Sequence, residues 1–305
     1  MRFGVVLPPE EIGVDPIVTR DFLQAAEALG YDFMGMPDHV LGADPTNRSS
    51  WQASSSDSVN RPYWTPYTHK DVFHEVLVTL SFAAGVTKTL ELFTGVLVLP
   101  QRQTALVAKQ GATIDVLSGG RLSLGVGIGW NEVEYEALGQ EFRTRASRIE
   151  EQIAVLRELW TKEVVTFHGR WHHIQEAGIN PLPVQRPIPI WMGGASDPVL
   201  RRAARLADGW APVDYSMEDN TRFVKTLHTY LREEGRDPAD FGILGRLRVA
   251  ATPQEHWGER YNGWRALGAT HFLVDTRKGG LDTVDDHVRL LERFLKTIPE
   301  MEGGA

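Results

Sequence analysis

The stretch LSLGVGIGWNE, residues 122–132, decides between two α/β architectures. Gly125, Gly127 and Gly129 follow a short apolar run and precede an acidic segment typical of a helix start. Glycines in this setting let a backbone approach a phosphate or a flat ring. A dinucleotide-binding fingerprint belongs on the first strand of a βαβ unit, and the next strand ends in an acidic residue. Here the glycines follow the fourth predicted strand, and the next strand-like segment runs into His168. The stretch therefore favours another α/β fold.

Strand-like and helix-like segments alternate along most of the chain. The predicted strands are rich in Val, Leu and Ile, as buried parallel strands are. They lie at residues 3–7, 33–36, 92–99, 122–126, 188–192, 209–212, 244–250 and 271–275, and helical segments follow them. Eight such units in 305 residues predict a (β/α)8 TIM barrel that forms a single domain over residues 1–305. A doubly wound sheet with a second domain is the alternative.

Local signals place several helix ends. Asp15 followed by Pro16 predicts an N-cap and a first helical residue, and Gly30 lies just past the end of that helix. Thr252 with Glu255 three residues later predicts a capping box at the start of another helix. The helix between the second and third strands is predicted over residues 72–84.

Two insertions interrupt the alternation. Residues 42–70 follow the second strand and contain six serines and several aromatic residues without an apolar period. Long loops in compact domains are often lids, so we expect this insertion to cover the site at the C-terminal face of the strands; a surface loop without function is the alternative. Residues 164–174 predict a peripheral hairpin outside the barrel.

Composition excludes several classes of function. The chain contains no cysteine, so disulfides, thiolate metal sites and cysteine nucleophiles are absent. A formal net charge of −8 without a basic stripe argues against a nucleic-acid partner. No apolar stretch approaches the length of a membrane span, and the first residues predict a strand rather than a signal peptide. We therefore expect a cytoplasmic protein that acts on small molecules.

In a barrel of this kind, functional residues lie at the C-terminal ends of the strands. After the fifth strand, glycines lead into a helix start whose free N–H groups suit a phosphate, at Gly193, Gly194, Ala195 and Ser196. The alternative is a tight turn that Ser196 or Asp197 caps. For the glycines of residues 125–129, the alternative to a wall beside a ring is a packing role.

His39, next to Asp38 after the second strand, is the candidate for general acid–base catalysis. A histidine hydrogen-bonded within its loop is the alternative. His172 and His173 are adjacent, and adjacent residues of a strand point to opposite faces, so we expect no metal site there. A glycosidase that uses two of Asp38, Glu132 and Asp275 is a weaker hypothesis.

Three segments carry a resemblance to a known family. They are MPDHV at residues 36–40, TGVLVLPQRQTALVAKQGATIDVLSGGRLSLGVGIGWNEVEYEALG at residues 94–139, and PIPIWMGGAS at residues 187–196. Together they resemble the luciferase-like oxidoreductases, over residues 1 to about 210 and more loosely beyond. Within that family the sequence is most similar to the branch that uses the deazaflavin coenzyme F420.

The resemblance implies a barrel that binds an isoalloxazine-type ring at the strand ends. It implies a cis peptide bond near Gly95-Val96 against the ring face. It also implies a wall beside the ring at Gly127, Ile128 and Gly129, a phosphate turn at Gly193 and Gly194, and a proton-transfer or substrate-contact role for His39. The expected substrate-binding residues are Asp38, Trp51, Trp64, Tyr67 and Trp130. The sugar-phosphate dehydrogenases of the family carry an acidic residue where this chain has Trp130, so their alcohol-oxidation mechanism is not carried over.

From this resemblance we expect hydride transfer between reduced F420 and a small organic substrate. An FMN-dependent monooxygenase that uses reduced flavin and oxygen is the alternative, and a non-catalytic flavin-binding protein is a further one. The acidic tail of F420 requires positive charge, for which Arg102, Arg246 and Arg248 are candidates, although salt bridges are another use for each. A homodimer and a separate cofactor-reducing enzyme are the expected partners.

Overall fold

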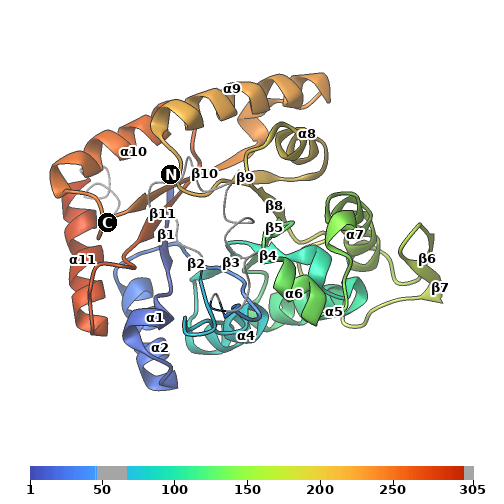
Figure 1. Cartoon of the computed structure of the whole chain (residues 1–305), viewed down its shortest axis with the longest axis horizontal. Helices are drawn as coiled ribbons and strands as arrows, with labels where there is room; N and C mark the ends of the chain where they lie inside the picture. Colours follow the sequence, from blue (N-terminus) through green and yellow to red (C-terminus); the bar gives the residue numbers. More distant parts are fainter. Residues whose placement is uncertain (45, 47–66, 299–305) are drawn as a thin grey trace.

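Short apolar strands close into a parallel barrel in the computed structural model, which describes residues 1–44, 46 and 67–298 (Figure 1). The barrel strands are β1 (Arg2–Val6), β2 (Phe33–Met36), β3 (Glu91–Thr94) with its continuation β4 (Leu97–Val98), β5 (Leu122–Gly127), β8 (Ile190–Gly193), β9 (Gly209–Ala211), β10 (Gly242–Arg248) and β11 (His271–Asp275). All neighbouring strands are parallel; β1 pairs with both β2 and β11, and β3 pairs with both β2 and β5. The sheet therefore closes, which confirms the predicted TIM barrel; the doubly wound alternative is wrong, because such a sheet is open.

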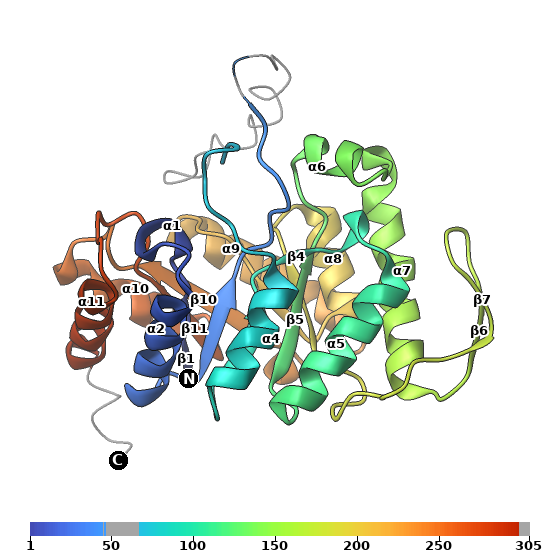
Figure 2. The same ribbon diagram turned by 90° about the horizontal axis from the view of Figure 1, so that it is seen from below.

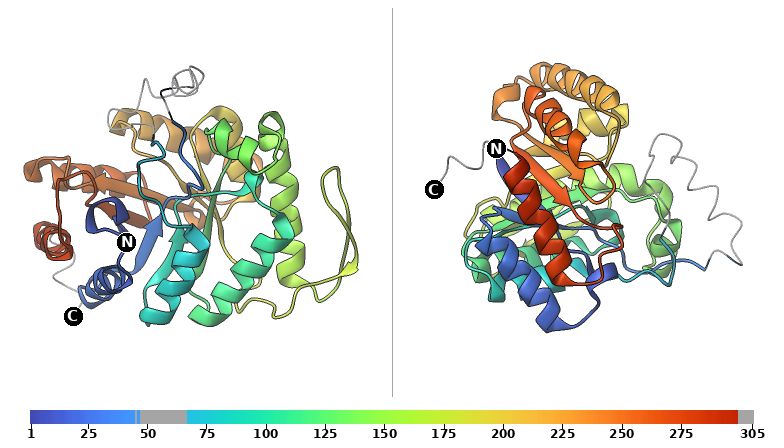
Figure 3. Two further views of the ribbon diagram at one scale, coloured as in Figure 1. Left: turned by 60° about the horizontal axis from the view of Figure 1, so that its bottom comes forward. Right: turned by 90° about the vertical axis from the view of Figure 1, so that its left-hand side faces the viewer.

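Helices surround the barrel (Figures 1 and 3). They are α1 (Pro9–Ile12), α2 (Pro16–Ala28), α4 (Val76–Val86), α5 (Thr104–Ser118), α6 (Glu132–Ala137), α7 (Arg145–Thr161), α8 (Asp197–Leu206), α9 (Met217–Glu233), α10 (Trp257–Ala266) and α11 (Val284–Thr297). Short 3-10 helices lie at Leu99–Gln101, Phe142–Thr144, Pro238–Asp240 and Gln254–His256. Across the described residues, none of these helices has the length and apolar character needed to cross a membrane.

Three helix starts in the structure can be compared with those predicted from the sequence. Asp15 caps α2 as predicted, because its carboxylate accepts a hydrogen bond from the backbone N–H of Ile17 at 2.8 Å. The capping box at Thr252 is wrong: a 3-10 turn precedes α10, its N-cap residue is Pro253, and no side chain caps it. α4 begins at Val76 rather than at residue 72, because Glu75 adopts an extended conformation and caps the helix.

The third barrel strand is not the continuous run that the sequence predicts. The Gly95–Val96 peptide bond is cis, as the family resemblance implies, and it separates β3 from β4. The chain continues into the 3-10 turn Leu99–Gln101 and then into α5. Residues 95–98 are thereby placed at the C-terminal mouth of the barrel.

The predicted hairpin is confirmed and extends three residues further. β6 (Val165–His168) and β7 (His173–Ala177) pair in antiparallel fashion and project beside α7, away from the barrel (Figure 2). At its tip, Glu151 of α7 accepts a hydrogen bond from the backbone N–H of His172 and a second contact joins Glu151 to Nδ1 of His172 at 2.7 Å. Nε2 of His172 lies 2.6 Å from Oγ1 of Thr104.

Of the insertion at residues 42–70, only the two ends lie within the described residues. A parallel β-bridge joins Ala43 to Thr68, so the two ends leave the barrel side by side. Trp51 and Trp64 lie outside the described residues. The covering role of the insertion stays a prediction.

One tryptophan organises the barrel interior. Trp191 of β8 is 7% exposed and packs among inward side chains of the barrel, including Phe93 of β3. Two glycines make room for its ring, because a Cβ would lie 2.3 Å from the ring at Gly209 and 2.4 Å from it at Gly242. Layers of side chains fill such barrels and form a solid base beneath the functional loops.

Replacing Gly242 with alanine is expected to destabilise the protein by about 1–3 kcal/mol, because the new methyl group would lie 2.4 Å from the buried ring of Trp191. The measurement is urea unfolding followed by far-UV circular dichroism. The control is Gly85→Ala in α4, where a Cβ meets no atom within 4 Å and stability should rise or stay the same. Equal stability of the two variants would contradict the clamped position of Trp191.

Candidate active site

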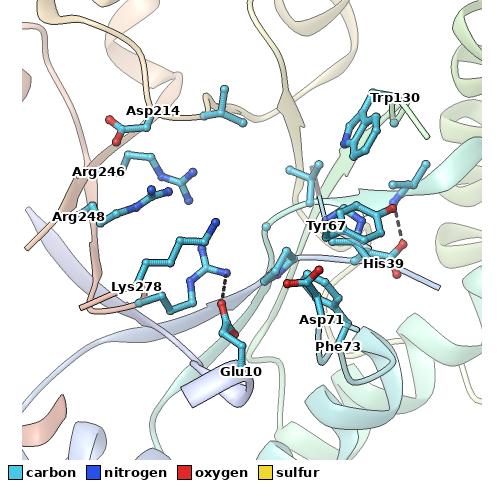
Figure 4. Close-up of a pocket in the computed structure, with 18 residues that line it drawn as sticks. Glu10, His39, Tyr67, Asp71, Phe73, Trp130, Asp214, Arg246, Arg248 and Lys278 are labelled. Carbon is cyan, nitrogen blue, oxygen red and sulfur yellow. Dashed lines mark hydrogen bonds and ion pairs between the residues drawn. The ribbon is translucent and has the colours of Figure 1, made fainter. Parts of the chain in front are cut away.

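A cavity of about 290 Å³ opens at the C-terminal ends of the barrel strands. Figure 4 shows two facing sides: His39, Tyr67, Phe73 and Trp130 form an aromatic wall, and Arg246, Arg248 and Lys278, together with Arg277, form a basic wall. Gly95, Val96, Val98 and Gly129 also line the cavity, and we refer to them as its apolar floor. Glu10, Pro37, Asp38, Asp71, Val213 and Asp214 complete the lining. The strand ends therefore bring together residues from almost the whole length of the chain.

The predicted site residues divide into two groups. Asp38, His39, Tyr67, Gly95, Val96, Gly129 and Trp130 line the cavity. Gly127, Ile128, Gly193, Gly194, Ala195 and Ser196 are not among its lining residues. The binding roles assigned to both groups stay predictions.

The side chain of Val96 accounts for the presence of glycine at two of the predicted positions, 127 and 193. A Cβ at Gly127 would lie 2.7 Å from a methyl group of Val96, and a Cβ at Gly193 would lie 3.0 Å from the other methyl group. These glycines therefore give room to the Val96 side chain. The apolar surface that reaches the cavity at this point is Val96 itself.

The turn after β8 has the features expected of an anion-binding helix start. Gly194 has a φ of 99°, a conformation that favours glycine. Ser196 is the N-cap residue of α8, and no side chain caps this helix start. The Asp197 side chain instead contacts Arg201 at 3.2 Å and Tyr230. The predicted alternative, a turn capped by Ser196 or Asp197, is therefore wrong.

The aromatic wall is closely packed. The ring centroids of His39 and Tyr67 are 3.8 Å apart, and those of His39 and Phe73 are 4.7 Å apart. Trp130 meets Tyr67 edge-on at 5.4 Å. This packing fixes the position of His39 beside the cavity.

Glu134 of α6 holds the aromatic wall from behind. Its Oε1 accepts hydrogen bonds from the hydroxyl of Tyr67 and from the backbone N–H of Val40, both at 2.8 Å. Asn131 donates from Nδ2 to the Tyr67 oxygen at 2.7 Å. Burial raises the pKa of Glu134 in spite of these hydrogen bonds. One carboxylate thus ties α6 to the loop after β2 and to the end of the insertion.

His39 is uncharged at neutral pH. Burial, followed by the positive charge of Arg277, lowers the pKa of His39 to about 3. Within the described residues its buried Nδ1 has no hydrogen-bond partner, and the nearest carboxylate oxygen, Oε1 of Glu134, is 3.8 Å away. The alternative of a histidine hydrogen-bonded within its own loop is therefore not supported at Nδ1.

Asp38 lines the cavity, but its carboxylate is already bonded to neighbouring residues of the barrel mouth. Its carboxylate accepts hydrogen bonds from Nη2 of Arg102 at 2.6 Å and from the backbone N–H of Val98 at 2.9 Å. Arg102 also pairs with Glu75 at 2.7 Å. Of the three arginines expected near a coenzyme tail, Arg102 is therefore held in salt bridges.

Two of the four cations of the basic wall, Arg277 and Lys278, were not predicted as part of the site. Arg277 donates from Nε and Nη2 to Asp275, at 2.9 and 2.8 Å. Although burial opposes it, the Arg277 charge holds the pKa of Asp275 below its usual range. Nε of Arg248 lies 3.9 Å from the same carboxylate.

The sequence contained a signal for part of this wall. Arg277 and Lys278 closely follow the eighth predicted strand, where the barrel rule places functional residues. Glu134 lies one helical turn beyond its strand-end loop, and no pattern in the sequence indicated it. Among the described residues, no group of three or more His, Asp or Glu side chains is arranged to hold a metal ion.

Comparisons with known proteins identify the family. Residues 61–290 match the model of the luciferase-like monooxygenases. An uncharacterized protein of Mycobacterium tuberculosis is 38% identical over 221 residues, which cover 72% of this chain and 73% of that protein. An F420-dependent glucose-6-phosphate dehydrogenase of Nakamurella multipartita is 28% identical over 302 residues, covering 96% of this chain and 80% of that enzyme.

A solved structure shows the same fold. An F420-dependent secondary alcohol dehydrogenase in complex with an F420–acetone adduct matches with a TM-score of 0.77 at 16% identity, over 97% of this chain and 98% of that one. The protein belongs to the luciferase-like monooxygenase family, which confirms the family that its sequence resembles, and it is an oxidoreductase.

The lowered pKa of His39 predicts a contribution to pH-dependent stability. Protonation is disfavoured in the folded chain relative to the unfolded chain, where the pKa is 6.5. The stabilisation is therefore present above pH 6.5 and is lost as the pH falls toward 3. From pH 7 to pH 5 the free energy of unfolding should therefore fall by about 2 kcal/mol, because His39 takes up a proton in the unfolded chain but not in the folded one.

The measurement is urea unfolding at both pH values for the wild type and His39→Asn. In His39→Asn the decrease in the free energy of unfolding from pH 7 to pH 5 should be about 2 kcal/mol smaller than in the wild type. The control is His256→Asn, because the His256 side chain is 56% exposed. An identical decrease in the wild type and His39→Asn would show that His39 titrates normally.

Proposed function

We propose that the protein uses coenzyme F420 and transfers a hydride between the reduced coenzyme and a small organic substrate. The observation that carries this proposal is the cavity, which combines an apolar floor with an aromatic wall and a basic wall. Relatives named as F420-dependent enzymes, found by sequence and by structure, support the choice of coenzyme.

The residues present fit such a coenzyme. A planar ring requires apolar contacts on its face, and Val96 with Gly95 and Gly129 supplies them at the floor. A phosphate requires backbone N–H donors at a helix start, and the turn before α8, where no side chain caps the helix, is the proposed position for it. The bound coenzyme supplies the hydride chemistry, and the protein supplies binding, orientation and exclusion of water.

His39 is the proposed proton acceptor when the substrate is oxidised. The ring is neutral and its Nδ1 has no partner within the described residues, so it can take a proton from a substrate hydroxyl as the hydride departs, while its pKa of about 3 makes it a weaker base than a free histidine. In the reverse reaction the same ring returns the proton. The carboxylate of Glu134, 3.8 Å from Nδ1, lies where it can stabilise the transient positive charge.

The alternative is a monooxygenase that receives reduced FMN from a separate reductase. The family description favours it, since it names luciferase-like monooxygenases. The turn after β8 would bind the phosphate of either cofactor. The two functions therefore differ in which ring is bound and in whether oxygen is consumed.

A binding titration separates these functions. The apo protein is titrated with F420 and with FMN, and tryptophan fluorescence reports binding, because Trp130 lines the cavity. We expect F420 to bind at least about tenfold more tightly, a difference of about 1.4 kcal/mol. The opposite preference, with oxygen uptake in the presence of reduced FMN, would replace the proposal with the monooxygenase. Tight binding without turnover of any acceptor would indicate a non-catalytic flavin-binding protein.

His39→Asn tests the proton-transfer role. We expect the variant to bind F420 as the wild type does and to lose about 10²- to 10⁴-fold in kcat. Turnover is followed by the absorbance of the oxidised coenzyme, with His256→Asn as the control. Full turnover in a His39→Asn variant that binds F420 would remove His39 from the mechanism.

A further inference from the structure

Arg246 is the one cation of the basic wall for which the described part of the chain provides neither a hydrogen bond nor an ion pair. Its Nε is buried without a partner. Figure 4 shows the side chain of Arg246 directed into the gap between the two walls, next to Arg248. An arginine stays protonated in proteins, so a positive charge lies at the cavity without an acceptor in direct contact within the described residues.

The two acidic residues that attract Arg246, Asp275 and Asp214, are bonded to other arginines. The carboxylate of Asp275 accepts two hydrogen bonds from Arg277, and Oδ1 of Asp214 lies 3.2 Å from Nη2 of Arg260. Glu10 lies 3.6 Å from Nη1 of Arg277. Asp71 belongs to the opposite side of the cavity, where it accepts hydrogen bonds from Thr68 at 2.6 and 3.0 Å.

The electrostatics agree with an uncompensated charge. Burial lowers the pKa of Arg246, and the attraction of Asp275 and Asp214 does not offset it. Arg277 and Arg248 add repulsion. An anion placed between the walls would relieve this repulsion and supply the missing acceptor for the guanidinium.

We propose that Arg246, supported by Arg248 and Lys278, binds an anionic group of the substrate, a carboxylate or a phosphate monoester. The aromatic wall then contacts the neutral, reacting part of the same molecule. This inference rests on the proposed function, because it places the substrate beside the coenzyme in one cavity. The substrate class is therefore a small organic molecule that carries both a carbon able to exchange a hydride and an anionic group.

The acidic tail of the coenzyme is a less suitable partner for Arg246. The coenzyme phosphate is proposed at the turn after β8, and the residues of that turn do not line the cavity. With the phosphate placed there, we propose that the tail beyond it lies outside the cavity. The cations at the ends of β10 and β11 then face the substrate.

The test compares Arg246→Met with Arg246→Lys, both with and without F420. Isothermal titration with inorganic phosphate and with acetate measures anion binding and distinguishes a phosphate site from a carboxylate site. We expect Arg246→Met to weaken binding of the preferred anion by about 10- to 100-fold, the loss of a charge-assisted hydrogen-bond pair. Arg246→Lys should retain part of the affinity, because it keeps the charge without the planar fork.

Stability separates a ligand-binding role from a structural one. Because Arg246 is buried and forms no hydrogen bond or ion pair within the described residues, Arg246→Met should keep or raise the midpoint of urea unfolding. Arg277→Met is the matched comparison on the same wall. It leaves the buried carboxylate of Asp275 without the arginine that donates two hydrogen bonds to it, and should lower that midpoint. Arg289→Met, at a side chain that is 63% exposed, should change neither stability nor anion binding.

Three results would overturn the inference. They are unchanged anion affinity in Arg246→Met, a loss of stability similar to that of Arg277→Met, and loss of F420 binding together with anion binding, which would assign Arg246 to the coenzyme. Failure of the proposed function gives a different result: F420 does not bind the wild type, while phosphate or acetate still binds through Arg246.

Discussion

The candidate site depends on one buried ion pair, between Asp38 and Arg102. The pair joins the loop after β2 to the end of the third barrel strand, and Arg102 extends it to Glu75, the residue that caps α4. The backbone N–H of Val98 completes the bonding of Asp38. Three segments of the barrel mouth are thereby fixed to one another, and His39 takes its position from this arrangement as the next residue along the chain.

Charge is unevenly distributed across the cavity mouth. On the aromatic side, the acidic groups are spent on holding structure: Asp38 binds Arg102, and Glu134 binds Tyr67 and the backbone. On the opposite side, Arg277 donates two hydrogen bonds to Asp275, whereas Arg246 forms no hydrogen bond or ion pair within the described residues. The two walls therefore present a neutral histidine on one side and positive charge on the other, which suits a substrate with two chemically different ends.

The fold was readable from the sequence because its signals are local. Apolar runs of Val, Leu and Ile marked the barrel strands, and Asp15 with Pro16 marked the start of α2. The error at Thr252 arose because a 3-10 turn after Pro253 replaces the expected cap. Partner choice was not readable: Arg102, Arg246 and Arg248 look alike in sequence, and only the tertiary structure separates the first from the second. Glu134 was missed for the same reason, since its partners are Tyr67 and Val40, which lie far away in the chain.

The clamped Trp191 has a consequence for how such a protein changes over time. Its ring is held by glycines of β9 and β10, below the loops that line the cavity. The packed interior around Trp191, which is the foundation of the site, and the surface of the cavity are thus formed by different residues. Selection can therefore exchange Phe73, Trp130 or Lys278 for other side chains without disturbing the foundation. A mutant library directed at these mouth positions would explore new substrates at little risk to folding, which makes the barrel a suitable starting point for redesign.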